Sequence, residues 1–206
     1  MNRSMVSVIC CCGLMLGVGC AKMKSTFGMD KSKPMSMDEM KRPAPPVQLR
    51  QLDPFIGSWE GTAEMVPDPK SPAATQPVRA FKGAGTHEWT MDGMAMKSTG
   101  WHEMPNNQKE TFVEYVVWDA DARKFRSYYV SDWGEHGNGW MWLDPDGRTF
   151  HWNGKSTDAM GNTSSMSGTS TLVDNNTMNW RFTGSGPMGK MQLKGTSNRV
   201  RNEGSK

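Results

Sequence analysis

The chain has 206 residues, with 24 basic and 21 acidic side chains and a formal net charge of +3. The positive surplus lies near the N-terminus, because from Pro43 onward 17 basic residues are balanced by 18 acidic ones. A near-neutral domain lacks the basic surface of nucleic-acid-binding proteins, so we expect no nucleic-acid partner. The roughly 160 residues after position 46 are enough for one domain with a sizeable core.

The first 19 residues have the features of an export signal. Arg3 precedes an apolar run from Met5 to Val18, and small residues lead to Cys20. This pattern is typical of a secretory signal peptide. The run is shorter than the about 20 apolar residues that a membrane-spanning helix needs.

Residues 16–20 resemble a bacterial lipoprotein box, in which the cysteine is acylated and becomes the mature N-terminus. The sequence departs from that family at Gly17, where leucine is preferred. The resemblance implies a lipoprotein of the cell envelope, anchored in the lipid bilayer through acylated Cys20. Because Ala21 rather than aspartate follows the cysteine, it also implies the periplasmic side of the outer membrane. The alternative is an ordinary signal peptide.

Residues 20–46 are rich in Met, Lys, Ser and Pro and have no apolar periodicity, which predicts a disordered tether. Cys20 would be the only cysteine of the mature chain, so no intramolecular disulfide is expected. Thioether spacing of the kind that Cu(I) favours occurs in two places, and it leaves copper binding as a weaker alternative. The methionines concerned are Met35, Met37 and Met40 in the tether, and Met91, Met94 and Met96 further on.

Beyond Pro54 the sequence predicts a series of consecutive β-strands. Short runs rich in aromatic and β-branched residues are separated by turn signals, which indicates an all-β domain. The predicted strands are 55–66, 78–91, 94–103, 110–118, 124–132, 137–143, 148–155, 163–172, 177–184 and 189–200. We therefore predict a single closed antiparallel up-and-down barrel over residues 47–202, because closure removes exposed strand edges. A disordered tail is expected at 203–206.

One hairpin is specific enough to predict its register. Asp92-Gly93 predicts a two-residue type I′ turn, which places Glu88 opposite Lys97 on an outer face. Because side chains alternate, the opposite face should point inward. That face carries His87, Trp89, Met96, Ser98 and His102, with Gly85 and Gly100 between them.

The second clear turn is Asp144-Pro145-Asp146-Gly147, which predicts a type I turn followed by a left-handed residue. Trp140 and Trp142 share a face of the strand before it, and Phe150 and Trp152 share a face of the strand after it. We expect these four rings to form one aromatic wall. Such a wall fills a core or lines a cavity, and the sequence leaves both possibilities open.

The segment Gly57-Ser58-Trp59-Glu60-Gly61, with an arginine on the last strand, resembles the closure signature of the calycin barrels (lipocalins, fatty-acid-binding proteins and nitrobindin-like proteins). The resemblance implies that Arg199 stacks on Trp59 and closes one end of the barrel, a contact worth about 0.5–2 kcal/mol. A closer resemblance is to the bacterial domain of unknown function 1579, through Trp59-Glu60-Gly61, residues 115–120 and Asp146-Gly147. These motifs are structural, so they imply a fold more than an activity.

The resemblance also suggests ligand chemistry. Fatty-acid-binding proteins hold a carboxylate with internal Arg and Tyr, a role that Arg126 and Tyr128 could take. Nitrobindin-like proteins bind haem through a histidine near the end of the barrel, but the last two predicted strands contain none. His87 and His102 share a face but are offset by four residues, about 13 Å, which is too far to chelate one metal ion. We expect no cofactor.

The function expected from these features is non-catalytic binding of a small apolar or amphipathic molecule inside the barrel. The predicted lining residues are His87, Trp89, His102, Arg126, Tyr128, Trp140, Trp142 and Trp152. One alternative is a structural or interaction protein of the envelope with a filled barrel. An enzyme that uses His136 with Asp132 or Glu135 is a weaker one, since the chain has no nucleophile elbow. The sequence leaves the oligomeric state open.

Overall fold

The computed structural model describes residues 41–68, 70, 78–104, 108–187 and 189–200. Residues Pro43–Lys206 form one compact unit. The predicted signal peptide, Cys20, most of the tether with its three methionines, and the predicted tail at 203–206 lie outside the described residues. Within the described ranges, no helix has the length and apolar character needed to cross a bilayer.

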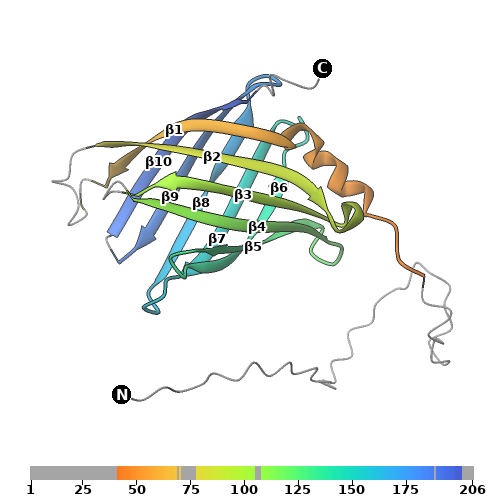
Figure 1. Ribbon diagram of the computed structural model, residues 1–206, viewed down its shortest axis with the longest axis horizontal. Coiled ribbons are helices and arrows are strands. Elements are labelled where there is room, and N and C mark those ends of the chain that lie inside the picture. Colours follow the sequence, from red (N-terminus) through yellow and green to blue (C-terminus); the bar gives the residue numbers. More distant parts are fainter. Residues whose placement is uncertain (1–40, 69, 71–77, 105–107, 188, 201–206) are drawn as a thin grey trace, which may run out of the picture. The chain divides into compact units, whose positions relative to one another are not determined.

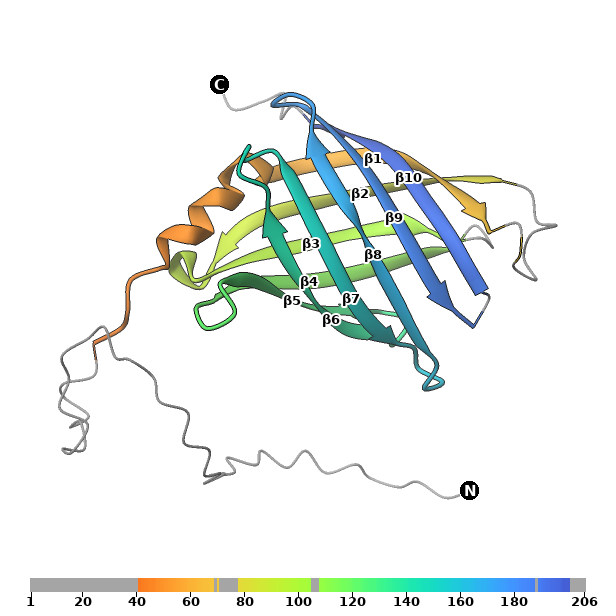
Figure 2. The same cartoon turned by 180° about the vertical axis from the view of Figure 1, so that it is seen from behind.

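Ten antiparallel strands close into a barrel, in which each strand pairs with its neighbours in sequence and β1 pairs with β10. The strands are β1 (Gly57–Pro67), β2 (Arg79–Thr90), β3 (Ala95–Glu103), β4 (Lys109–Asp119), β5 (Lys124–Ser131), β6 (His136–Leu143), β7 (Thr149–Thr157), β8 (Thr163–Leu172), β9 (Thr177–Gly186) and β10 (Gly189–Arg199). The predicted all-β barrel is confirmed, with each strand boundary within two residues of its expected position. In Figure 1, β1 to β4 cross in front of β7 to β9, and Figure 2 shows the same crossing from behind.

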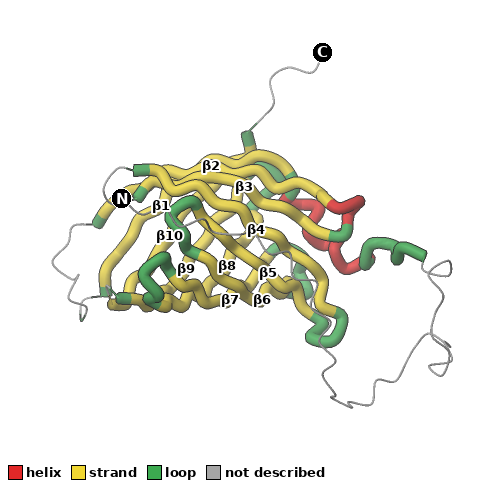
Figure 3. Tube along the Cα trace, turned by 60° about the horizontal axis from the view of Figure 1, so that its bottom comes forward, coloured by secondary structure: helices red, strands yellow, loops and turns green. Residues whose placement is uncertain are grey.

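A short helix closes one end of the barrel. The apolar lead-in before β1 folds as a 3-10 helix, η2 (Val47–Phe55), which Figure 3 shows beside the ends of the strands. Its buried residues Leu49, Leu52 and Phe55 are three apart, and a 3-10 helix has three residues per turn, so all three lie on one face. Leu49 and Leu52 are 1% and 0% exposed. This face packs on a core made of Trp59, Met96, Val116, Phe125, Phe150 and Leu172.

The Gly-x-Trp motif of β1 joins this cap to the last strand. Trp59 Nε1 donates to the Phe55 carbonyl at 2.9 Å, and Arg199 Cζ lies 4.4 Å from the Trp59 ring centroid. Gly57 has a φ of +127°, and a Cβ at this position would lie 2.5 Å from Arg199 Nη1. The glycine therefore makes room for the guanidinium that covers Trp59.

The hairpin between β2 and β3 has the predicted register. Glu88 pairs with Lys97 and Trp89 with Met96. Asp92 and Gly93 have positive φ values of 54° and 82°, and Met94 N donates to Met91 O at 3.2 Å, as a type I′ turn requires. Met96 is 4% exposed in the core, whereas Met91 is 59% exposed. These two predicted thioether ligands therefore lie in different environments.

The hairpin between β6 and β7 corrects the expected aromatic wall. The turn itself is as predicted, because Gly147 has a φ of +69° and its N–H donates to the Asp144 carbonyl at 2.9 Å. However, Trp142 pairs with His151, and Trp152 pairs with Met141. The two tryptophans of β6 therefore lie on the opposite face of the sheet from Phe150 and Trp152, and no single wall forms.

Candidate functional site

The inner wall of the barrel carries a polar row across four adjacent strands. The register places His87 of β2 opposite Ser98 of β3, Ser98 opposite Glu114 of β4, and Glu114 opposite Tyr129 of β5. All four residues lie on the face that also carries the core residues Met96 and Val116. The row thus places polar groups on the same inner face as the apolar core.

His87 forms one end of this row. Its Nδ1 lies 2.7 Å from Ser98 Oγ, and Ser98 is 1% exposed. Burial, with a smaller contribution from the nearby positive charge of Arg199, lowers the pKa of His87 to about 4. The imidazole is therefore neutral at physiological pH and can both donate and accept a hydrogen bond.

Glu114 is the central residue of the row. Burial raises the pKa of its carboxyl group to about 7, although a hydrogen bond with Ser127 opposes part of this shift. Burial also raises the pKa of the neighbouring Tyr129, with further contributions from Glu110 and Glu135. Near neutral pH the carboxyl group of Glu114 thus exists in both protonation states, and it can donate a hydrogen bond or carry a negative charge.

A second polar pair lies on the inner face near the end of the barrel that η2 does not close. His102 Nε2 is 2.9 Å from Glu110 Oε2, and the His102 side chain is 42% exposed whereas that of Glu110 is 3% exposed. Burial alone would raise the pKa of Glu110, but hydrogen bonding, first of all from His102, holds it below its usual value. Phe112 contacts both His102 and Tyr129, with ring centroids 6.0 and 5.9 Å apart.

The inner wall away from η2 keeps accessible surface. The side chains on this part of the wall are only half-buried, although the backbone of the strands separates them from the outer surface. They include Phe112, Glu114, Tyr129, Trp152, Met166, Trp180 and Phe182. Met166 and Trp180 also line grooves of the outer face. The exposed part of the other side chains therefore faces the interior. The end near η2 differs, because Val116 and Phe125 there are 0% exposed.

Glycines allow the aromatic rings to lie against the wall. A Cβ at Gly195 would lie 2.5 Å from the Trp180 ring, and one at Gly168 would clash with the Phe182 ring. Trp180 Nε1 also donates to Ser197 Oγ at 3.2 Å, and Phe182 contacts the Trp152 ring edge-on at 5.7 Å. The rings thus cover neighbouring strands and do not point across the interior.

Four of the predicted lining residues lie on the outer face, so their assignment is corrected. Arg126 pairs with Trp140, and its Cζ lies 4.3 Å from the Trp140 ring centroid. Arg126 Nη2 donates to Asn138 at 3.0 Å, and Tyr128 is 51% exposed. Trp142 stacks on His151 at 5.2 Å. The inward positions of β5 and β6 are instead the alternating neighbours, such as Ser127 and Met141.

The other predicted lining residues lie on the inner face but at different distances from the end that η2 closes. Trp89 Nε1 donates to Asp53 Oδ1 at 2.9 Å, and Arg50 lies 5.2 Å from its ring, so Trp89 belongs to the closed end with η2. His87 and Trp152 lie further along the wall, and His102 lies near the opposite end. The sequence reasoning missed Glu114, although its place between Phe112 and Val116 marks a carboxyl group in an apolar stripe.

The residues of the weaker enzymatic alternative have separate partners. Asp132 Oδ1 accepts a hydrogen bond from the Thr111 backbone N–H at 2.9 Å, while His136 Nδ1 lies 3.4 Å from the Gly134 carbonyl. His136 is exposed on the outer face. In the described part of the chain, no group of three or more His, Cys, Asp or Glu side chains is placed to hold a metal ion.

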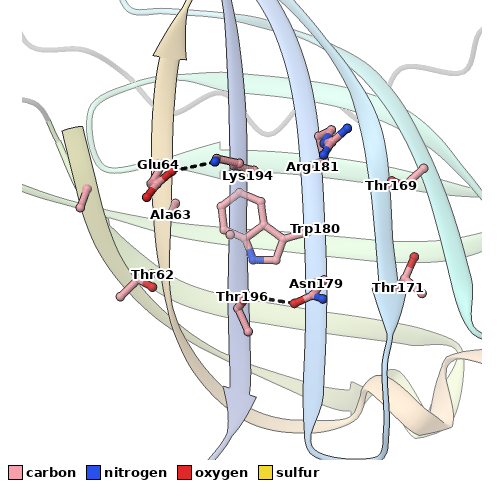
Figure 4. Close-up of a pocket in the computed structure, with 12 residues that line it drawn as sticks. Thr62, Ala63, Glu64, Thr169, Thr171, Asn179, Trp180, Arg181, Lys194 and Thr196 are labelled. Atoms are coloured by element: carbon pink, nitrogen blue, oxygen red, sulfur yellow. Dashed lines mark hydrogen bonds and ion pairs between the residues drawn. The ribbon is translucent and has the colours of Figure 1, made fainter. Parts of the chain in front are cut away.

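The outer face has two grooves of about 610 Å³ each. The first, shown in Figure 4, lies over β1, β8, β9 and β10. Within it, Lys194 Nζ pairs with Glu64 Oε2 at 2.9 Å, and Thr196 Oγ1 donates to Asn179 Oδ1 at 2.9 Å. Four of the polar side chains in this groove thus bind one another.

Comparisons with known proteins address the fold. No family model matches the sequence, and no curated protein matches it. The crystal structure of Rv2717c from M. tuberculosis aligns with a TM-score of 0.52 and 12% identity, over 77% of this chain and 100% of that one. The fold is a calycin-like ten-stranded β-barrel.

Two further solved structures align less closely. The S-type phycobiliprotein lyase CPES from Guillardia theta has a TM-score of 0.49 and 11% identity, over 74% of this chain and 92% of that one. The structure of EF1p2_mFAP2b bound to DFHBI has a TM-score of 0.43 and 11% identity, over 74% and 98%. At these identities the likeness concerns the fold alone, and membership of the domain of unknown function 1579 stays a prediction.

Proposed function

We propose that the protein binds one small amphipathic molecule inside the barrel and does not change it chemically. The observation that carries this proposal is the position of Glu114. It is an ionisable side chain on a largely apolar inner wall, in a row with His87 and Ser98. Buried ionisable groups outside an ion pair are costly for stability, and they are found preferentially at functional sites.

The surroundings of Glu114 suit a ligand with one polar end. The polar row occupies one part of the wall, and half-buried aromatic rings such as Trp152 and Phe182 cover the opposite part. Small-molecule sites generally combine an apolar lining with a few convergent polar groups. The polar end of the ligand would bind Glu114 and His87, and its apolar part would contact the rings.

Native mass spectrometry of the full chain, purified from the cell that produces it, tests this proposal. We expect an excess mass that disappears when the same sample is denatured. The Trp152→Ala variant should retain less of this mass than the wild type, whereas Trp142→Ala, on the outer face, should retain all of it. A chain that carries no excess mass, and whose tryptophan fluorescence does not respond to 1-decanol, would favour the filled barrel of a structural protein.

We also propose that the protein is an exported lipoprotein of the bacterial cell envelope, which faces the periplasm from the outer membrane. The support is the sequence of residues 1–20, with Cys20 as the acylated residue and the lipid bilayer as its partner. Cys20→Ser should move the protein from the membrane fraction to the soluble fraction, whereas Cys12→Ser should change nothing. Unchanged fractionation and mass of the Cys20→Ser variant would contradict lipidation.

A further inference from the structure

We propose that the interior ligand is a cationic amphiphile, a molecule with an apolar chain and a protonated amine, whose ammonium group binds the carboxylate of Glu114. This inference rests on the proposed function and specifies its ligand class. It follows from the charges that the inner wall presents to Glu114.

The strands beside Glu114 bring no positive charge to it. Ser98 of β3 and Tyr129 of β5 are its direct neighbours, and Ser127 is its hydrogen-bond partner. His87, at the end of the row, stays neutral because burial lowers its pKa to about 4. On the same strand, Glu110 adds a second carboxylate, whose partner is His102.

The described side chains of the strands across the interior bring no free positive charge to Glu114 either. Among the described side chains, the inner positions of β6 to β9 hold only apolar residues, glycine and serine, as the pairing of Met141 with Trp152 and of Met166 with Gly184 illustrates. On β10 the inner face carries Arg199, but this guanidinium already donates to the carbonyls of Pro54, Ile56 and Asn175. Its face covers Trp59 at the closed end.

Three classes of ligand therefore differ in how well they match the charges around Glu114. A carboxylate ligand would place a further negative charge near Glu114 and Glu110, and the described side chains of the inner wall include no free cation to bind it. A neutral alcohol would leave an ionised Glu114 without a counter-charge. An ammonium group supplies that counter-charge, and the faces of Trp152 and Trp180 attract cations as well as apolar chains.

The test compares three probes of equal chain length, 1-decylamine, 1-decanol and decanoate, by isothermal titration calorimetry. The full chain is titrated at pH 8 and pH 6, with each probe below its micelle concentration. Burial raises the pKa of Glu114 to about 7, so its carboxyl group is mostly ionised at pH 8 and mostly neutral at pH 6. At pH 8 we expect decylamine to bind about ten-fold more tightly than decanol, and decanoate to bind most weakly.

The variant Glu114→Gln should lose the preference for decylamine and keep its affinity for decanol. The control Glu60→Gln, on the outer face of β1, should bind like the wild type. If Glu114→Gln does not fold, the wild-type comparison still decides, because the preference for the amine must fall from pH 8 to pH 6. Decanoate binding as tightly as decylamine would overturn this inference and leave the proposed function intact. Failure of all three probes to bind would overturn both.

Discussion

Arg199 covers the indole of Trp59 at 4.4 Å and donates hydrogen bonds to three backbone carbonyls, two of them at the junction of η2 and β1. One side chain thus joins the last strand, the first strand and the helix that closes the barrel. Hydrogen bonds from a charged donor contribute about 1.5–3 kcal/mol each. The closed end should therefore depend on this guanidinium.

We expect Arg199→Ala to lower the free energy of unfolding by about 3 kcal/mol, through loss of these hydrogen bonds and of the cation–π contact. Arg199→Lys should recover little of it, because an ammonium group cannot reproduce the planar fork. Urea denaturation followed by tryptophan fluorescence measures both. Arg181→Ala, on the outer face of β9, is the control, and a loss as large as that of Arg199→Ala would show that the effect is not specific to closure.

Gly57 should tolerate no side chain. Its φ is +127°, and a Cβ there would lie 2.5 Å from Arg199 Nη1, so Gly57→Ala adds a clash to backbone strain of about 1–3 kcal/mol. Gly147→Ala is a matched control, because Gly147 also has a positive φ, +69°, but nothing lies within 4 Å of its Cβ position. We expect the Gly57 variant to have the lower urea midpoint. Equal midpoints would mean that Arg199 moves aside freely.

Glu114 should make stability depend on pH. Its pKa rises from 4.5 in the unfolded chain to about 7 in the folded one, so its stabilising contribution is fully present below pH 4.5 and is lost as the pH rises through about 7. Glu114→Gln removes this loss. The free energy of unfolding of the variant relative to wild type should increase by about 3 kcal/mol between pH 4.5 and pH 8. A difference that is the same at both pH values would show that the carboxyl group is solvated.

His87 should act in the opposite direction. Its pKa falls from 6.5 to about 4 on folding, so its contribution is present above pH 6.5 and is lost as the pH falls toward 4. His87→Gln should remove about 3 kcal/mol of acid sensitivity over that range. His136→Gln, at an exposed outer position, should leave the acid sensitivity unchanged. Unfolding curves at pH 7 and pH 4.5 compare the three proteins.

Much of the fold could be predicted from the sequence because each strand alternates and each hairpin has a turn signal. Asp92-Gly93 determines the register of β2 and β3, so the inner face with His87 and His102 followed from counting. The 3-10 helix was harder to predict from the sequence. Leu49, Leu52 and Phe55 have its three-residue period, but a segment of nine residues that contains a proline and leads directly into a strand carries little local signal for a helix.

The candidate site was predicted only in part, because the loop between β6 and β7 determines which side chains of the two strands lie on the same face of the sheet. Leu143 pairs with Phe150 and Trp142 with His151, so residues 144–149 lie between the last two paired positions. Because the number of residues between them is even, Trp142 and Trp152 lie on opposite faces. Glu114 could have been recognised, since strand alternation puts it on the same face as Phe112 and Val116. Its raised pKa depends on burial by distant strands, which no local pattern shows.

The central claim is that a ligand binds inside the barrel and not on its outer surface. The most direct measurement is methyl NMR of the full chain with ¹³C-labelled methionine methyl groups, titrated with 1-decylamine at pH 8. Met191 occupies an inner position of β10, whereas Met160 is 87% exposed. We predict chemical-shift changes and ligand contacts at Met191, and none at Met160. Changes confined to Met160, or no change at any methionine, would contradict interior binding.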